Sequence, residues 1–280
     1  MGDFAIDTAV EGSDGEYRAR LSRDWEIWGP NGGYVAAVAL RAAGAATPLT
    51  RPATFNCHFL NVADFDTVDL RVTTLRASKR AASLNVSMTQ KDRLILQAGV
   101  WVVADGSDGF VRDTAQRPEA PSPSSLKSVD ELVVEHNIDI SARYRFWDNL
   151  ECRPIDMTPW PLRKPGEPRI LDWYRFRPRA TFDDPFVDAA RSLLLIDTMI
   201  WPANCRAYED KDIVYIAPSL DVNVHFHQAA AESEWLLVDT VSPLAEGGLI
   251  SGRSSIWSMQ GKLVASGSGQ LFCRPAPPRP

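Results

Sequence analysis

The chain has 280 residues, of which 45% are hydrophobic and 24% charged, a composition typical of a folded globular protein. Its net charge of −6 at pH 7 argues against nucleic-acid binding, because contacts along a phosphate backbone need clustered lysine and arginine in excess. No apolar run is long enough to span a bilayer and the first residues lack the pattern of a secretion signal, so we expect a cytoplasmic protein without a membrane span.

The first half begins with a glycine-rich turn at residues 29–33. This turn leads into the alanine-rich segment Tyr34–Ala43, which we predict to be a helix buried on most sides. Strand-like runs follow at Ala53–Leu60, Thr67–Leu75, Ala82–Thr89 and Arg93–Val103. One buried helix followed by a set of antiparallel strands is an α+β arrangement.

The second half repeats this scheme after a stretch, residues 105–128, whose glycine, proline, serine and charge are typical of a linker. We predict a helix from Phe186 to about Ile200 and strands at Ile170–Arg177, Asp221–His227, Glu234–Val241, Leu249–Trp257 and Lys262–Phe272. Residues 275–280 are expected to be a disordered tail.

One strand sequence occurs twice: Asn56-Cys57-His58-Phe59 returns 167 residues later as Asn223-Val224-His225-Phe226. The repeat predicts two similar units, residues 1–105 and 131–280, joined by a linker at 106–130. We expect Asn56 to superpose on Asn223 and Phe59 on Phe226, with the two sheets joined and the two helices packed centrally. The second copy carries Asp221 where the first carries Thr54, so only the second has an ionisable group there.

Several short motifs together resemble those of the acyl-CoA thioesterase II (TesB-like) family. In the second half they are Ser219-Leu220-Asp221, Phe226-His227, Trp235-Leu236-Leu237, Gly252-Arg253 and Leu263-Val264-Ala265-Ser266. In the first half they are Gly32-Gly33, Phe59-Leu60 and Ser78-Lys79-Arg80, and the likeness covers roughly residues 25–105 and 150–274. The resemblance implies a double hotdog fold, in which each unit wraps a curved antiparallel sheet around a long helix. It also implies hydrolysis of a fatty acyl-CoA, the partner, to free acid and CoA without a metal or other cofactor.

The resemblance further implies a site in which an Asp, a Thr and a Gln activate a water. The Asp falls on Asp221, but the Thr falls on Pro243, which leaves Ser242 or Thr240 to supply the hydroxyl. The Gln falls on Gly269, with Gln270 next to it. Because a one-residue shift turns a strand side chain to the opposite face, Gln270 can serve only if a bulge at residues 267–269 re-aims it.

Hydrolysis of a thioester requires a positioned water, a base that takes its proton, and hydrogen-bond donors for the oxyanion. Asp221 can act as the base. Gly32 and Gly33 lie where the first predicted helix begins, so their free N–H groups and the helix dipole favour a developing negative charge. The remaining substrate contacts that we expect are Trp28 with an acyl or adenine group, and Lys79, Arg80 and Arg253 with the CoA phosphates.

Other classes fit less well. A protein that binds acyl groups or acyl-CoA without cleaving them is the main alternative, since Pro243 and Gly269 depart from the family pattern. A hydratase is disfavoured because no Asp and His lie together on one short segment with Asn-Pro nearby. Metal binding at His225 and His227 is disfavoured because His58 repeats His225 in the first unit, and no Gly-x-Ser-x-Gly elbow suggests a serine nucleophile. The sequence leaves the acyl chain length, the pathway and homo-oligomer formation open.

Overall fold

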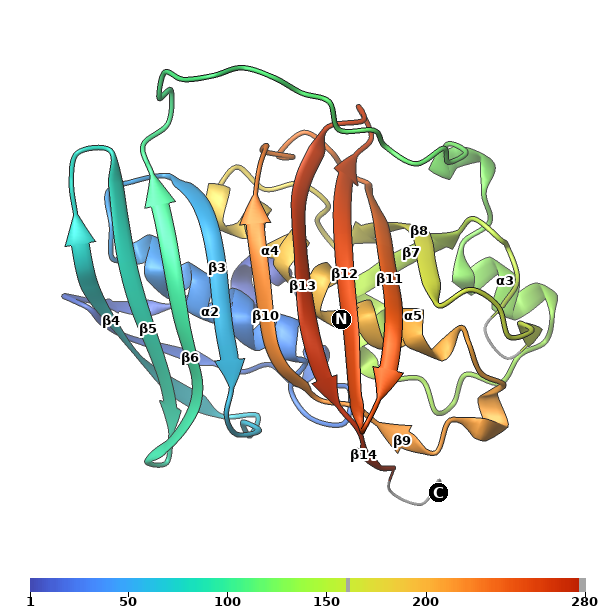
Figure 1. Ribbon diagram of the computed structural model, residues 1–280. Coiled ribbons are helices and arrows are strands. Elements are labelled where there is room, and N and C mark those ends of the chain that lie inside the picture. Colours follow the sequence, from blue (N-terminus) through green and yellow to red (C-terminus); the bar gives the residue numbers. More distant parts are fainter. Residues whose placement is uncertain (160–161, 277–280) are drawn as a thin grey trace.

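A computed structural model describes residues 1–159 and 162–276 (Figure 1). A single sheet of 12 strands has the order β1-β2-β4-β5-β6-β3-β10-β13-β12-β11-β8-β7. Its strands are β1 (Glu11–Ser13), β2 (Glu16–Arg20), β3 (Arg51–Phe59), β4 (Thr67–Ala77), β5 (Ala81–Gln90), β6 (Arg93–Val103), β7 (Leu150–Pro154), β8 (Arg169–Phe176), β10 (Ser219–Phe226), β11 (Leu236–Glu246), β12 (Leu249–Ser258) and β13 (Leu263–Phe272). Two short strands, β9 (Tyr215–Ile216) and β14 (Arg274–Pro275), pair separately.

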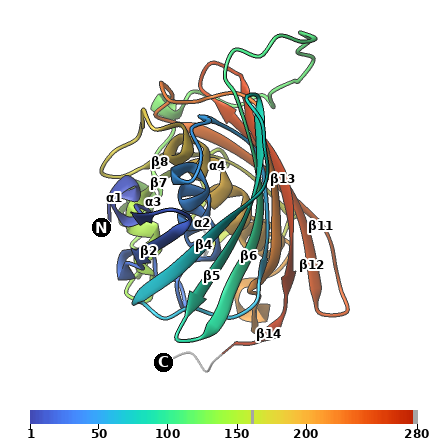
Figure 2. The same cartoon turned by 90° about the vertical axis from the view of Figure 1, so that its left-hand side faces the viewer.

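The helices are α1 (Phe4–Asp7), α2 (Gly32–Ala45), α3 (Val129–Glu135), α4 (Pro185–Thr198) and α5 (Ile200–Cys205), with short 3-10 turns at Arg23–Trp25, Pro123–Ser125, Arg145–Asn149 and Asp210–Asp212. The sheet curves strongly, and α2 and α4 lie in its hollow (Figures 1 and 2). We call the face toward these two helices the inner face and the opposite face the outer face. The main core fills the space between the inner face and the helices.

Helix α2 begins at Asn31, whose side chain accepts a hydrogen bond from the N–H of Tyr34 at 2.9 Å and so caps the first turn. Its alanines leave little side-chain bulk, and ten of its residues are buried. The helix therefore approaches α4 closely: a Cβ on Gly33 would lie 2.7 Å from the Cα of Leu194. Gly44 likewise faces the Phe186 ring, so the two helices pack antiparallel.

Helix α4 carries charge inside the core. Asp184 caps its first turn by accepting from the N–H groups of Phe186 and Val187 at 2.8 and 3.3 Å. One turn on, Asp188 and Arg191 form a buried ion pair, and Arg191 also donates to the carbonyl oxygens of neighbouring loops. These partners bind both terminal nitrogens of Arg191 and offset much of the cost of burying the ion pair, while its Nε has no hydrogen-bond partner.

The repeated strands meet at the centre of the sheet. Strands β3 and β10 pair antiparallel with Asn56 directly opposite Asn223, and His58 opposite Asp221. The two copies of the repeat are therefore related by an approximate twofold axis that passes between these two asparagines. This arrangement confirms that the sheets of the two units join and that their helices pack centrally.

Some elements differ from the sequence prediction. Helix α1 and strands β1 and β2 were not predicted, and the ring of Phe4 lies 4.8 Å from that of Phe176 in β8. The start of the chain thus packs against the second unit. The expected tail at 275–280 begins inside β14, and residues 277–280 lie outside the described residues. Among the residues that the structure describes, no helix is long and apolar enough to cross a membrane.

Candidate active site

The first turn of α2 meets the last turn of α4 on the inner face. A Cβ added to Gly32 would lie 2.9 Å from Oδ2 of Asp197, which shows how close this carboxylate comes to the start of α2. Asn31, the cap of α2, donates from its side chain to Thr198 Oγ1 at 3.0 Å and so holds the two helix ends together. The start of a helix has free N–H groups and the positive end of its dipole, which together favour a negative group.

Asp197 is a buried carboxyl group without a cationic partner. Its Oδ1 atom has no hydrogen-bond partner, and no ion pair within the described residues involves it. Burial raises the pKa of Asp197 to about 6, against the stabilising effects of the Ser219 side chain and the Gly33 N–H. The nearby charge of Asp221 raises this pKa further. A carboxyl group tuned close to neutral pH is suited to exchange a proton with a bound water.

Ser219 reaches Asp197 because of an irregularity in β10. In the pairing with β13, Ser219 lies opposite Leu271 and Asp221 lies opposite Gln270, so Leu220 is an extra residue in β10. Leu271 is buried, which places Ser219 on the inner face. A bulge of this kind re-aims the side chain next to it. Here it brings a hydroxyl group to the carboxyl group of Asp197.

The related position at the start of α4 is built differently. Alignment of the two helices from their first residues sets Gly44 against Asp197, and Phe186 against Gly33. The Phe186 ring fills the space beside Gly44, and Asp184 already satisfies the first N–H groups of α4. The pseudo-twofold arrangement therefore provides this constellation at only one of the two helix starts.

Asp221, the base expected from the sequence, does not face this site. Val222 and Val224 of β10 are fully buried against the helices, so Asp221 and Asn223 project to the outer face. The Asp221 Oδ1 atom accepts a hydrogen bond from the Gln270 N–H at 2.8 Å. Asp221 is thus close enough to act on the pKa of Asp197 but is held on the other side of the strand.

The expectation for Gln270 is also corrected. The register of β13 is regular from Ala265 to Gln270 against both neighbours, so no bulge occurs at residues 267–269. A Cβ on Gly269 would point at Ile200 of α5, which marks the inner face, and the adjacent Gln270 therefore faces outward. There its Oε1 atom accepts from the Ser251 hydroxyl at 3.4 Å, a long contact.

Thr240 and Ser242 lie on the inner face but on β11, three strands from β10, or roughly 14 Å at about 4.8 Å per strand. The Thr240 hydroxyl bonds that of Ser254 at 2.7 Å, and Ser242 donates to the Ser251 carbonyl at 3.0 Å. Both hydroxyl groups are buried and satisfied locally. The structure does not bring either of them to Asp197.

Ile200 occupies the place where the family resemblance would put a glutamine side chain. Gly252 and Gly269 are paired on adjacent strands, and a Cβ on either would lie within 3.0 Å of the Ile200 side chain. The two glycines and the isoleucine therefore fit together as one packed contact. A glutamine at 269 would have to displace α5 from the sheet.

The residues that were expected to contact the CoA phosphates do not lie at the candidate site. Lys79 and Arg80 lie in the β4–β5 turn, at the same end of the sheet as Arg51. The candidate site lies near Phe59 at the other end of β3, and the stretch from Arg51 to Phe59 spans roughly 26 Å at about 3.3 Å per residue. Arg253 projects from the outer face. Trp28 does lie close to the site, in the turn that precedes α2, and its side chain is 41% exposed.

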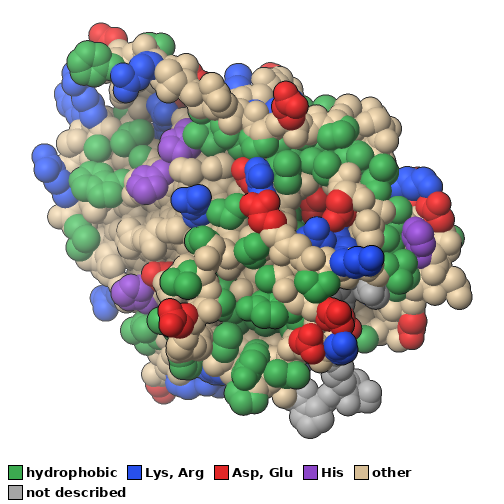
Figure 3. Space-filling model, turned by 45° about the vertical axis from the view of Figure 1, so that its right-hand side comes forward, with side chains coloured by type: hydrophobic (Ala, Val, Ile, Leu, Met, Phe, Trp, Pro, Cys, Tyr) green, Lys and Arg blue, Asp and Glu red, His purple; other side chains and the backbone are tan. Residues whose placement is uncertain are grey.

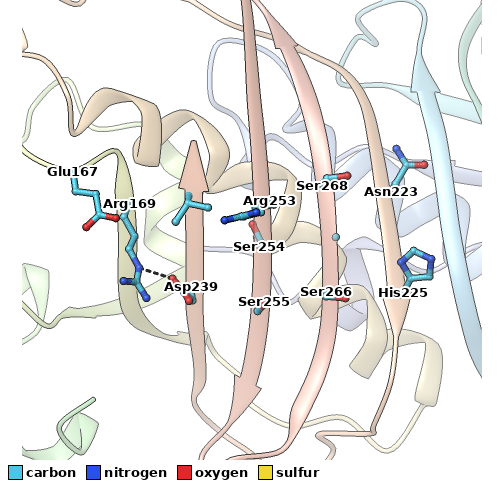
Figure 4. A pocket seen from close by; sticks show the side chains of 12 residues that line it. Glu167, Arg169, Asn223, His225, Asp239, Arg253, Ser254, Ser255, Ser266 and Ser268 are labelled. Carbon is cyan, nitrogen blue, oxygen red and sulfur yellow. Dashed lines mark hydrogen bonds and ion pairs between the residues drawn. The ribbon is translucent and has the colours of Figure 1, made fainter. Parts of the chain in front are cut away.

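A surface cavity of about 580 Å³ lies on the outer face, away from Asp197. Arg253, Asp239, Arg169 and serine side chains line it from adjacent strands (Figure 4). Arg169 is paired with Asp239 at 2.7 Å. Figure 3 shows uncharged atoms over much of this face, with histidines among them.

Within residues 1–159 and 162–276, no three His, Cys, Asp or Glu side chains are grouped so that they could hold a metal ion.

Comparison with known proteins gives the family. The model of the acyl-CoA thioesterase N-terminal domain matches residues 21–103, and that of the acyl-CoA thioesterase C-terminal domain matches residues 114–272. The chain therefore belongs to the acyl-CoA thioesterase family, a family of thioester hydrolases.

Solved structures show the same fold. Acyl-CoA thioesterase II TesB2 from Mycobacterium marinum has a TM-score of 0.78 at 20% identity, covering 98% of this chain and 99% of its own. The tesB protein of Mycobacterium avium subs paratuberculosis gives 0.79 at 22%, with 97% and 98% covered. A conserved hot dog protein of unknown function from Alicyclobacillus acidocaldarius gives 0.80 at 17%, with 98% of each chain covered. These matches confirm the α+β double hotdog fold.

The sequence analysis missed Asp197 and gave Ser219 no role of its own. The available signal was an acidic residue inside the apolar run Leu193–Trp201 of a helix that was already predicted to be buried. An unpaired carboxyl group at such a position is rare and is commonly functional.

Proposed function

We propose that the protein hydrolyses an acyl-CoA thioester and that Asp197 activates the attacking water. The observation that carries this proposal is the buried, unpaired Asp197 carboxyl group at the start of α2, with its pKa raised to about 6. At neutral pH most of this group is ionised and can accept a proton. Ser219 and the Gly33 N–H keep the carboxylate in position.

The reaction requires each proton and bond to be accounted for. Asp197 takes a proton from water as the oxygen attacks the thioester carbonyl carbon. The oxyanion that forms is stabilised by the dipole of α2 and by the Gly32 N–H, which lies in the first turn where no intrahelical acceptor exists. Collapse of the intermediate breaks the carbon–sulfur bond, and Asp197 returns the proton to the CoA thiolate. The products are the free acid and CoA.

The activity should depend on pH through Asp197. Because the raised pKa lies at about 6, the base is ionised above this value and protonated below it. We expect kcat/KM to be constant from about pH 7 to 8 and to fall roughly tenfold per pH unit below 6. Asp221 raises this pKa, so Asp221→Asn should move the fall to lower pH. Thiol release measured across pH 5–8 provides the test, and a rate independent of pH over this range would contradict the assignment.

Ser219 should matter through its hydroxyl group. Ser219→Ala removes a group that stabilises the ionised form of Asp197, so we expect kcat to fall roughly 10- to 100-fold and the pH profile to move upward. Ser219→Thr keeps the hydroxyl group and should retain activity within about threefold. Steady-state kinetics on both variants decides the point. Equal loss in both would indicate a packing effect rather than a hydrogen bond.

Binding of acyl-CoA without cleavage is the second candidate. Gly269 favours it, because the glutamine implied by the family resemblance is absent and Ile200 fills its place. Release of free CoA from a panel of acyl-CoA substrates, from acetyl to hexadecanoyl, separates the two. Turnover by the parent protein that disappears in Asp197→Asn supports hydrolysis. Saturable binding with no thiol release supports the second candidate.

A further inference from the structure

Four of the apolar side chains exposed at the end of the sheet that carries the candidate site lie close to that site. They are Trp28 at 41%, Leu60 at 48%, Val62 at 46% and Leu220 at 41% exposure. We call this set the apolar collar. Large apolar side chains that gather on one part of a surface commonly mark a binding site.

The collar is continuous with the candidate site. Leu60 follows Phe59, whose ring would lie 3.4 Å from a Cβ on Gly32. Leu220 is the extra residue of the β10 bulge and follows Ser219 directly. Strands β3 and β10 are paired at this end of the sheet, so Leu60, which follows the last residue of β3, lies near Leu220 of β10.

Val62 and Trp28 complete the collar from two connecting segments. A Cβ on Gly29 would lie 3.3 Å from Val62 Cγ1, so the turn that contains Trp28 rests against the β3–β4 connection. This turn is closed by a hydrogen bond from the Ile27 N–H to the Gly29 carbonyl at 2.9 Å. Trp28 and Val62 therefore lie beside the segment that leads into α2, and Leu60 and Leu220 follow two residues of the candidate site, Phe59 and Ser219.

Several charged groups near the collar are paired with one another. Arg23 lies 3.8 Å from Glu26, and Asp64 lies 3.1 Å from Lys91 and 3.6 Å from Arg93. These pairs reduce the net charge that a ligand meets on this surface. An apolar ligand therefore suits the collar better than a phosphate or a carboxylate.

We propose that the collar binds the alkyl chain of the acyl group, so that the protein selects long acyl chains over acetyl. The inference rests on the proposed function, because it needs the thioester carbonyl at the start of α2. From there an alkyl chain that leaves the site meets Leu60, Leu220, Trp28 and Val62. Each methylene covered by these side chains should raise kcat/KM up to roughly fourfold. The charged CoA half is directed away from the collar.

The test compares dodecanoyl-CoA with butanoyl-CoA. For the double variant Trp28→Ser/Leu60→Ser we expect the ratio of their kcat/KM values to fall at least roughly tenfold relative to the parent. Leu75→Ser is the matched control, since Leu75 is an equally apolar side chain, 66% exposed on β4, outside the collar. It should leave the ratio unchanged. Binding of both ligands is measured in an Asp197→Asn background, which removes turnover from the comparison.

The outcomes separate the collar from the proposed function. A parent ratio that the double variant lowers and Leu75→Ser does not supports the collar. Equal loss for both acyl-CoAs places the CoA half on the collar and overturns the inference, and so does an unchanged ratio in an active protein. If the parent releases no thiol, the proposed function fails. The inference that the collar binds the alkyl chain is then kept only if the parent binds dodecanoyl-CoA more tightly than butanoyl-CoA and the double variant loses this difference.

Discussion

Replacement of Asp197 by asparagine should lower kcat for acyl-CoA hydrolysis by roughly 10³-fold, within the range expected when a positioned general base is lost. Asparagine has nearly the same shape and can still interact with Ser219 and the Gly33 N–H, so the fold should be kept. Thiol release under saturating substrate measures the effect. Activity within a few-fold of the parent would show that Asp197 does not take the proton.

The same substitution should make the folded protein more stable at pH 8. A pKa raised from 3.8 to about 6 means that ionisation of Asp197 is harder in the folded than in the unfolded state. Above pH 6 this opposes folding by roughly 3 kcal/mol, and the effect vanishes below the unfolded pKa. Asp197→Asn should therefore raise Tm at pH 8 and raise it less at pH 4.5. A lower Tm at both pH values would contradict a destabilising buried charge.

Gly33→Ala should have the second large effect, on both stability and rate. The new Cβ would lie 2.7 Å from the Cα and 2.8 Å from the carbonyl oxygen of Leu194, and neither backbone atom can rotate away. The helices α2 and α4 must separate, which we expect to lower the free energy of unfolding by about 1–3 kcal/mol. Because this shift moves Asp197 relative to the start of α2, kcat should fall roughly 10²-fold.

A glycine in open space provides the control for this substitution. Gly109→Ala adds the same methyl group where no atom lies within 4 Å, so it should change neither the free energy of unfolding nor kcat. Chemical denaturation and thiol release on both variants measure the two quantities. Normal stability in Gly33→Ala would show that the helices do not rely on this close approach.

The fold could be predicted from the sequence because its signals are local and occur twice. The repeated Asn-x-His-Phe strand predicted the joined sheet, and the structure places Asn56 opposite Asn223 at the junction. The alanine-rich segment after Gly33 predicted a helix that packs closely. Helix α1 carried no such signal, since its four residues form a helix only through a capping Asp3 and tertiary contacts of Phe4.

The site was harder to predict because it joins residues from distant elements. Asp221 has the right chemistry on the right strand, but it precedes the buried Val222 and so faces outward, whereas the extra residue Leu220 places Ser219 on the inner face. A bulge is set by pairing with β13, which the sequence of β10 alone does not contain. Asp197 comes from a helix that meets Gly33 only in the folded chain.

The measurement that tests the account most directly compares two carboxyl groups on opposite faces of the sheet. Thiol release from one acyl-CoA substrate at pH 8 is measured for the parent, Asp197→Asn and Asp221→Asn, with folding checked by thermal unfolding. We predict a loss of roughly 10³-fold for Asp197→Asn and a change of less than about tenfold for Asp221→Asn. The reverse order would contradict the account and return the role of base to Asp221.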